Sequence, residues 1–295
     1  MKVEKVELPN LFIVGAPRAG TTSLYEYLRQ HPEVYICPIK EPHYFVRKDL
    51  FEFHDGIAPP KILDFKDYIK LFKDGKCKKI RGEASTNYLY SKSATYEISK
   101  LIPDAKVIIS LRNPIERALS HYKRDITAYG IIMGKGFCEA IKRRPFYLWM
   151  GLYYEHVKRY LETFSTQNVK IIIYDDLKKD SLSVMIDICR FLEIDENYNF
   201  NLSKKYNVSL LPKSLVINKI TVKARDHILR KILPSLFYSK AKSLYFKIFA
   251  SEYSNNFDFD VSKCMDFLIS YFRDDVKKLS DLLQRDLTFW LENEN

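Results

Sequence analysis

A short apolar run near the start of the chain leads into a turn framed by two glycines and then into a helix. Leu11–Val14 has the composition of a buried strand, Gly15 and Gly20 bracket the turn, and a helical pattern runs from Thr21 to about Gln30. The backbone N–H groups of such a turn, together with the helix N-terminus, form a cradle for an anion. We therefore expect an anion site here, the alternative being a turn that only serves packing.

Apolar runs and helical patterns continue to alternate along most of the 295 residues. Strands are predicted at Val34–Ile39, Ile80–Ala84, Val107–Leu111 and Val169–Tyr174, and helices after Asn113 and over Gly151–Phe164, Ser181–Leu192 and Val261–Gln284. This alternation predicts an α/β fold with a central parallel sheet flanked by helices, in a single domain over residues 1–295. The less regular stretch 197–254 is expected to form a basic, mainly helical insertion or lid.

Charge is unevenly distributed along the chain. The net charge is +11, and the segment from Lys213 to Lys247 contains nine lysines and arginines but a single acidic residue, Asp226. Such a local field favours an anionic partner, which by charge alone is a nucleotide, an acidic sugar, a nucleic acid or a membrane surface. A solvated basic face without a ligand is the alternative.

The cysteines and the hydropathy pattern bear on the compartment. The five cysteines are odd in number, and no two of them have the spacing of a metal site, so we expect reduced and mostly buried thiols in a cytoplasmic protein. No apolar run approaches the roughly 18 residues that a membrane span needs. Mixed charges over residues 1–10 argue against a cleaved signal. Peripheral attachment to a membrane stays open.

Two positions separate this chain from the magnesium-dependent nucleotide triphosphatases. Those proteins place a lysine directly after the second glycine, where this chain has Thr21, and its positive charge lies inside the turn at Arg18. They also end a neighbouring strand with an aspartate for the metal, whereas Val107–Leu111 is followed by Arg112. The guanidinium suits a second phosphate, and Ser120, two turns into the next helix, offers a hydroxyl to the same anion.

The helix that follows Arg112 has a clear start signal. Asn113 is placed to cap it, Pro114 suits its first turn, and Glu116 has the spacing of a capping-box partner. The chain thus offers two anion sites at neighbouring strand ends and no evident metal site. That pattern fits a nucleotide with phosphate groups at both ends of its ribose.

These motifs resemble the sulfotransferases that use 3′-phosphoadenosine 5′-phosphosulfate (PAPS), and most closely their bacterial and heparan-sulfate-type, carbohydrate-directed branch. The resemblance implies a P-loop-NTPase-like sulfotransferase fold. It is carried by LFIVGAPRAGTTSLYEYLRQHPEVYICPIKEPHYF (Leu11–Phe45) and VIISLRNPIERALSHYKRD (Val107–Asp125), with weaker support from Gly82–Tyr90, Ile171–Leu177 and Arg285–Leu291.

Site residues follow from this resemblance by position. The residues implied to hold the 5′-phosphosulfate are Arg18, Ala19, Gly20, Thr21 and Thr22. Arg112 and Ser120 would bind the 3′-phosphate, with Lys213 as an additional contact. The family usually has a Lys-Ser pair where this chain has Arg18-Ala19; arginine still stabilises charge on a bridging oxygen but does not donate a proton as lysine does.

Two residues compete for the role of general base. Glu41, in the segment Lys40–Phe45, matches the glutamate of the carbohydrate-directed relatives, and a carboxylate within hydrogen-bond reach can take the proton of an acceptor hydroxyl. His43 is the other candidate, because an imidazole titrates near neutral pH. Alternatively, Glu41 only pairs with Arg18, and His43 is only packed in the core.

The function expected from the sequence is a PAPS-dependent, metal-independent sulfotransferase (EC 2.8.2 class) that acts on a hydroxyl or amine of a carbohydrate-like acceptor. A lipid or small-molecule hydroxyl is the alternative acceptor. A kinase-like phosphoryl transferase and a non-enzymatic module that binds acidic glycans are the alternative classes. No nucleic-acid partner is expected, and the sequence does not determine the oligomeric state.

Overall fold

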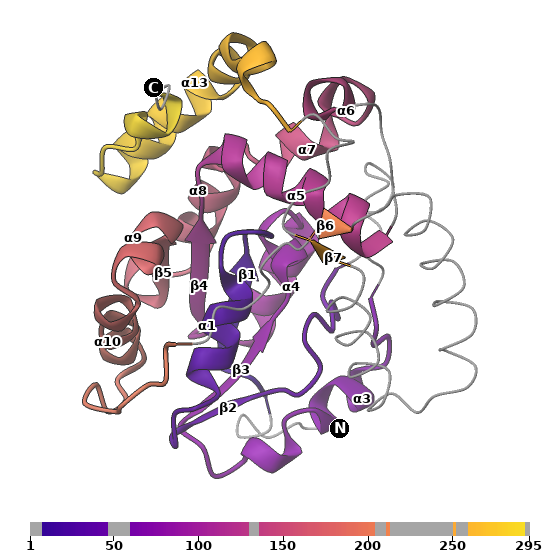
Figure 1. The fold of residues 1–295 in the computed structure, drawn as a ribbon. Helices are drawn as coiled ribbons and strands as arrows, with labels where there is room; N and C mark the ends of the chain where they lie inside the picture. The colour runs from indigo at the N-terminus through magenta and orange to yellow at the C-terminus, as the bar shows by residue number, and fades with distance from the viewer. Residues whose placement is uncertain are drawn as a thin grey trace. The chain divides into compact units, whose positions relative to one another are not determined.

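A computed structural model of the chain describes residues 8–46, 60–129, 136–203, 211–212, 250–251 and 259–292 (Figure 1). Its strands are β1 (Leu11–Gly15), β2 (Val34–Ile36), β3 (Ile80–Ala84), β4 (Lys106–Leu111), β5 (Val169–Ile173), β6 (Leu211–Pro212) and β7 (Ala250–Ser251). Its α-helices are α1 (Thr21–Leu28), α3 (Phe65–Lys70), α4 (Lys92–Leu101), α5 (Pro114–Tyr129), α6 (Phe137–Arg143), α7 (Phe146–Trp149), α8 (Tyr154–Thr163), α9 (Tyr174–Lys179), α10 (Ser181–Leu192) and α13 (Met265–Leu283). The whole basic segment 213–247, including Lys213, lies outside the described residues.

The central sheet has five parallel strands in the order β2-β3-β1-β4-β5. The predicted α/β class is therefore confirmed. β1 lies in the middle, between β3 and β4, so the loops that follow these three strands meet at one edge of the sheet. In open parallel sheets this carboxyl edge is where ligands bind.

Helices α1, α9 and α10 share one apolar core with a face of this sheet. From the strands, Leu11, Ile13, Ile108 and Ile172 point into that core. Their helical partners include Leu24, Leu28, Leu177, Met185 and Ile188. Neighbouring strand residues such as Phe12, Val107 and Ile109 are also completely buried, and alternation directs them to the opposite face. Burial on both faces explains why these strands are continuous apolar runs in the sequence.

The chain divides into two compact units. The first contains the sheet and comprises Met1–Arg117, Met150–Asn207 and Phe272–Glu292, and the second comprises Ala118–Trp149, Val208–Tyr271 and Asn293–Asn295. Helices α5 and α13 each run from one unit into the other. The expected lid over 197–254 falls largely outside the described residues and stays a prediction.

Within the second unit, a disulfide joins Cys138 of α6 to Cys264, which directly precedes α13. The expectation of reduced thiols is therefore wrong for this pair. Their Cα atoms lie 5.8 Å apart although 126 residues separate them along the chain, an approach that sequence spacing does not reveal. Cys37 and Cys189 are free and buried, as expected, and Cys77 is free and exposed.

Candidate active site

The turn after β1 is held by the neighbouring strand β4. The hydroxyl of Ser110, fully buried in β4, donates to the carbonyl of Ala19 (2.5 Å), and the N–H of Ala16 donates to the carbonyl of Ser110 (2.6 Å). Both ends of the turn are thus tied to one residue of an adjacent strand. This arrangement fixes the backbone path of the turn that the sequence predicts to bind an anion.

Gly20 forms the junction between the turn and α1. It is the N-cap residue, it has φ 82°, and no side chain caps the helix there, so no side-chain oxygen of the cap competes with an incoming anion. A Cβ on Gly20 would lie 2.8 Å from Cδ2 of Tyr174. Only glycine therefore combines the left-handed backbone with this close approach.

We expect Gly20→Ala to lower the free energy of unfolding by about 1–3 kcal/mol, because alanine adds both backbone strain and a clash with Tyr174. Urea denaturation of the whole chain measures the loss. Lys100→Ala, at an exposed position of α4, should change stability by less than about 0.5 kcal/mol. Equal stabilities of the Gly20 and Lys100 variants would contradict the reasoning.

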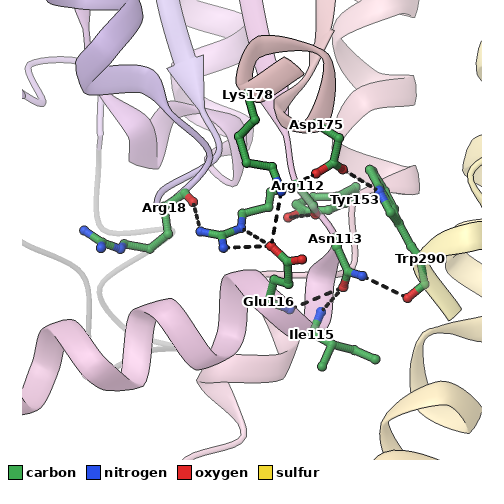
Figure 2. A network of polar contacts seen from close by, with 9 residues as sticks. All are labelled: Arg18, Arg112, Asn113, Ile115, Glu116, Tyr153, Asp175, Lys178 and Trp290. Atoms are coloured by element: carbon green, nitrogen blue, oxygen red, sulfur yellow. Dashed lines mark hydrogen bonds and ion pairs between the residues drawn. The ribbon is translucent and has the colours of Figure 1, made fainter. Parts of the chain in front are cut away.

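Arg112 follows β4 and contacts both the turn and the first turn of α5. Its Nε and Nη2 donate to Oε2 of Glu116 (3.0 and 2.7 Å), and its Nη1 donates to the carbonyl of Arg18 (3.3 Å). The guanidinium also lies over the ring of Tyr174, 4.9 Å from its centroid. In Figure 2 the guanidinium of Arg18 points away from that of Arg112. The two cations therefore face different places along the same edge.

Glu116 does not complete the predicted capping box. Asn113 caps α5 as expected, since its Oδ1 accepts from the N–H groups of Ile115 (2.9 Å) and Glu116 (3.3 Å). The carboxylate of Glu116 instead accepts from Arg112, and Nζ of Lys178 lies 3.9 Å from it. Attraction by a full guanidinium charge outweighs the weaker capping interaction.

Residues after β5 and near the end of the chain complete this network (Figure 2). Asp175 accepts from Nζ of Lys178 (2.8 Å) and from the indole N–H of Trp290 (3.1 Å). The carbonyl of Trp290 in turn accepts from the side-chain amide of Asn113 (3.0 Å). The loops that follow β4 and β5 are thus tied to each other through Trp290.

The candidate base Glu41 lies near the end of β3. The N–H of Glu41 donates to the carbonyl of Ala84 (2.9 Å), the last residue of β3, and so places Glu41 at the carboxyl end of β3. Oε1 of Glu41 accepts from Nζ of Lys40 (3.1 Å) and from the hydroxyl of Thr86 (3.2 Å). The partly exposed carboxylate is thus held in place by a lysine and a hydroxyl.

His43 lies against Glu41, with its Nε2 3.5 Å from Oε2 of the carboxylate. The imidazole is fully buried, and neither of its nitrogens has a hydrogen-bond partner among the described residues. The long separation from Glu41 is an electrostatic contact without hydrogen-bond geometry. A buried polar group with no partner is uncommon in a core and is typical of a site that receives a ligand.

Backbone conformation singles out the same residues. Arg18 (φ 71°), Glu41 (φ 57°) and His43 (φ 56°) occupy the left-handed region. The other described non-glycine residues with positive φ are Glu193, at the end of α10, and Gln284, which follows α13. Such strained conformations gather at functional sites, where the surroundings hold them in place.

The structure brings most of the predicted site residues to the carboxyl edge of the sheet. Thr21 is buried at the start of α1, and Thr22 is partly exposed beside it. Ser120 lies on α5 within the second unit, so its predicted phosphate contact stays a prediction, as does that of Lys213. Lys178, Thr86 and Ser110 were not singled out from the sequence. Ser110 lies within β4 and Thr86 two residues after β3, which was the available signal, whereas Lys178 lies inside α9.

The described residues contain neither a metal-binding cluster nor a membrane-spanning helix. No group of three or more histidine, cysteine, aspartate and glutamate residues in the described part of the chain could hold a metal ion. None of the described helices combines the length and the hydropathy that a membrane span requires.

A parallel sheet with a strand–glycine turn–helix unit at its centre and cations at its carboxyl edge defines a P-loop-like α/β protein built to hold a phosphorylated ligand. The chain belongs to the sulfotransferase family, because the model of the sulfotransferase domain matches residues 8–245. Members of this family take the sulfuryl group from PAPS. The resemblance inferred from the motifs is confirmed.

Several relatives resemble this chain. The bifunctional heparan sulfate N-deacetylase/N-sulfotransferase 4 of Mus musculus is 28% identical over 213 residues, which are 66% of this chain and 23% of that protein. The heparan sulfate glucosamine 3-O-sulfotransferase 3A1 of Mus musculus is 26% identical over 212 residues, 68% of this chain and 51% of that protein. The chain therefore spans about a quarter of the length of the first relative and about half of the length of the second.

Among solved structures, a sulfotransferase from Alicyclobacillus acidocaldarius is similar over nearly the whole chain. The TM-score is 0.69 and the sequence identity 27%, with 97% of this chain and 99% of that chain covered. The match supports the sulfotransferase fold.

Proposed function

We propose that the protein transfers a sulfuryl group from PAPS to a hydroxyl or amine of a carbohydrate acceptor. The observation that carries the proposal is the order of groups along the carboxyl edge of the sheet: the carboxylate of Glu41 at β3, the glycine turn after β1, and the guanidinium of Arg112 after β4. This order suits a donor whose reactive group lies between an acceptor and a 3′-phosphate.

The donor side fits a phosphosulfate. The N-terminus of α1 and the turn at Gly20 offer backbone donors, and no side-chain cap engages them. Arg18 supplies a cation within the turn. When PAPS is bound, it supplies the activated sulfuryl group; Arg18 and the backbone donors stabilise the negative charge that gathers on the bridging oxygen.

The acceptor side supplies a base. Glu41 takes the proton of the acceptor hydroxyl while the new sulfur–oxygen bond forms and the bond from sulfur to the phosphate oxygen breaks. The products are the sulfated acceptor and adenosine 3′,5′-bisphosphate (PAP). Lys40 stabilises the ionised base, and His43, buried beside it, is available to orient the acceptor.

The acceptor class is proposed from the relatives described above, which are heparan sulfate sulfotransferases. Lys40 and Lys61 lie beside Glu41 and would favour an acidic sugar, with Nζ of Lys61 bonded to the carbonyl of Lys40 (2.5 Å). A lipid and a small phenol are the alternative acceptors, and the assay below includes a phenol. The cytoplasmic location expected from reduced thiols loses that support, since oxidising compartments favour disulfides such as Cys138–Cys264.

Calorimetry with PAP and with ATP-Mg²⁺ tests whether the protein is a sulfotransferase or a phosphoryl transferase. Transfer of [³⁵S]sulfate from PAPS tests the reaction itself. The acceptors would be N-desulfated heparan sulfate, a neutral oligosaccharide and 4-nitrophenol. We expect PAP to bind more tightly than ATP-Mg²⁺ and the polysaccharide to be labelled. Preference for ATP-Mg²⁺ would favour a phosphoryl transferase, and polysaccharide binding without any transfer would favour a non-enzymatic glycan-binding module.

Arg112→Ala should weaken the binding of PAP by about 10- to 100-fold, because charge-assisted hydrogen bonds to a phosphate contribute about 1.5–3 kcal/mol. Calorimetry measures the dissociation constant. The control is Arg190→Ala, which removes an exposed arginine paired with Glu196 and should leave PAP affinity unchanged. Equal affinities of the two variants would contradict the assignment of Arg112 to the 3′-phosphate.

A further inference from the structure

Glu83 is a fully buried carboxylate for which the proposed chemistry has no direct use. It lies in β3 with an exposed fraction of 0%. Its Oε1 accepts from the hydroxyls of Tyr68 (2.5 Å) and Tyr88 (3.1 Å), and its Oε2 accepts from the hydroxyl of Ser85 (2.9 Å). Burial raises the pKa of Glu83 to about 7, and the three hydroxyls act against that rise. A buried carboxylate is costly unless it is hydrogen-bonded, so these three donors are what make its position tenable.

Two of the three hydroxyls also accept hydrogen bonds from the loop that carries the candidate base Glu41. The N–H of His43 donates to Oγ of Ser85 (3.2 Å), and the N–H of Phe45 donates to Oη of Tyr88 (3.2 Å). A backbone N–H only donates, so each hydroxyl accepts there and directs its own proton to Glu83. Both series of hydrogen bonds therefore run in the same direction: the backbone N–H donates to the hydroxyl, and the hydroxyl donates to the carboxylate of Glu83.

The loop held in this way is strained. Glu41 and His43 both have positive φ, and each such residue costs about 1–3 kcal/mol unless its surroundings hold it. Two further hydrogen bonds hold the loop in addition to those that lead to Glu83. The N–H of Glu41 donates to the carbonyl of Ala84, and the carboxylate of Glu41 accepts from the hydroxyl of Thr86. Every one of these contacts comes from β3 or from the residues directly after it.

We propose that Glu83 is a positioning residue: through Ser85 and Tyr88 it holds the backbone of residues 43–45, and so holds Glu41 and His43 where the acceptor binds. This inference rests on the proposed function, in which Glu41 takes the acceptor proton. Reaction rates are sensitive to such positioning, because a displacement of about 1 Å of a reacting group can cost about 100-fold in rate.

Tyr68 provides a matched control. It donates to the same oxygen of Glu83 as Tyr88 does, but no hydrogen bond leads from its hydroxyl to the loop. Its ring stacks on Tyr44 at 4.5 Å between centroids, a contact that phenylalanine preserves. Tyr68→Phe therefore removes a buried hydrogen bond from the network and leaves both links to the loop in place.

The experiment compares Ser85→Ala, Tyr88→Phe and Glu83→Gln with Tyr68→Phe. Three quantities are measured: kcat and KM in the [³⁵S]PAPS assay with N-desulfated heparan sulfate, the dissociation constant of PAP, and hydrogen–deuterium exchange of the peptide covering residues 41–46. We expect the three linking variants to lower kcat by about tenfold or more, to speed exchange in this peptide, and to keep PAP affinity within about twofold. Tyr68→Phe should lower the melting temperature but leave kcat and exchange near the wild-type values.

The proposal fails if Tyr68→Phe loses as much kcat as Ser85→Ala, or if exchange in residues 41–46 is unchanged in Ser85→Ala and Tyr88→Phe. Should Glu83→Gln fail to fold, these single-link variants still decide the question. A wild-type protein that labels none of the acceptors would overturn the proposed function. The exchange data would still show whether the network holds the loop.

Discussion

Replacing Arg18 by alanine is expected to lower kcat by about 100- to 1,000-fold. Removal of one preorganised donor that faces developing charge has an effect of this size in other transferases and hydrolases. Arg18 lies in the turn between β1 and α1, and its backbone is held at the carbonyl by Arg112 (3.3 Å). The [³⁵S]PAPS assay measures kcat, and calorimetry with PAP, which has no sulfate, measures the remaining nucleotide affinity.

Arg18→Lys is the matched variant, because it keeps a positive charge and adds a group that donates a proton more readily. We expect it to recover part of the activity that alanine loses. A rate for Arg18→Ala within about threefold of wild type would be incompatible with electrostatic stabilisation by this residue. Binding of acidic polysaccharide that survives Arg18→Ala, without any transfer, would favour the non-enzymatic alternative.

The second large effect is expected for Glu41→Gln, which should lower kcat by about 100- to 10,000-fold and leave PAP affinity within about threefold. Glutamine is isosteric, so the hydrogen bond from Thr86 (3.2 Å in the wild type) can be kept while the basicity is lost. The measurement is kcat at saturating PAPS. Because PAP contacts the glycine turn and Arg112 in the proposed site, its affinity does not depend on the base.

Glu162→Gln, at an exposed glutamate of α8, serves as the control and should have wild-type kcat. His43→Asn addresses the competing base. Full activity of Glu41→Gln together with an inactive His43→Asn would transfer the role of base to His43. Loss of nucleotide binding in Glu41→Gln would instead indicate a structural role for this residue.

The strands of the central sheet and the glycine turn after β1 could be predicted from the sequence because local patterns encode them. Ile80–Ala84 and Ser181–Leu192 have the predicted bounds, and β1 extends the predicted strand by one residue. These elements are apolar runs or amphipathic repeats with clear flanking signals. Helix α1 ends at Leu28, two residues before the predicted end, because His31-Pro32 marks only an outer limit for a helix.

Other elements were not predicted because their stability comes from tertiary packing. Helices α3, α4, α6 and α9 lack a long apolar repeat. α4 begins at the cap Ser91, whose hydroxyl accepts from the N–H of Ala94 (3.0 Å). One serine before a segment of mixed polar and apolar residues is weak evidence for a helix start, because the sequence contains many serines.

The candidate site likewise combines residues that have a local sequence signal with contacts that do not. Arg18, Glu41 and Arg112 could be predicted because each directly follows or adjoins a motif. The contact of Glu116 with Arg112 is local, and there the capping-box spacing favoured the wrong partner. The support from Lys178 and the links from the Glu83 network to residues 43–45 depend on segments far apart in the sequence meeting in space. The disulfide between Cys138 and Cys264 was predicted incorrectly for this reason.

The position of Trp290 between Asn113 and Asp175 has a consequence for biosynthesis. Trp290 lies 177 residues after Asn113 and 115 residues after Asp175, so the ribosome releases β1, β4 and β5 long before the residue that ties the loops after β4 and β5 together. A nascent chain therefore completes this part of the carboxyl edge only after residue 290 has left the ribosome.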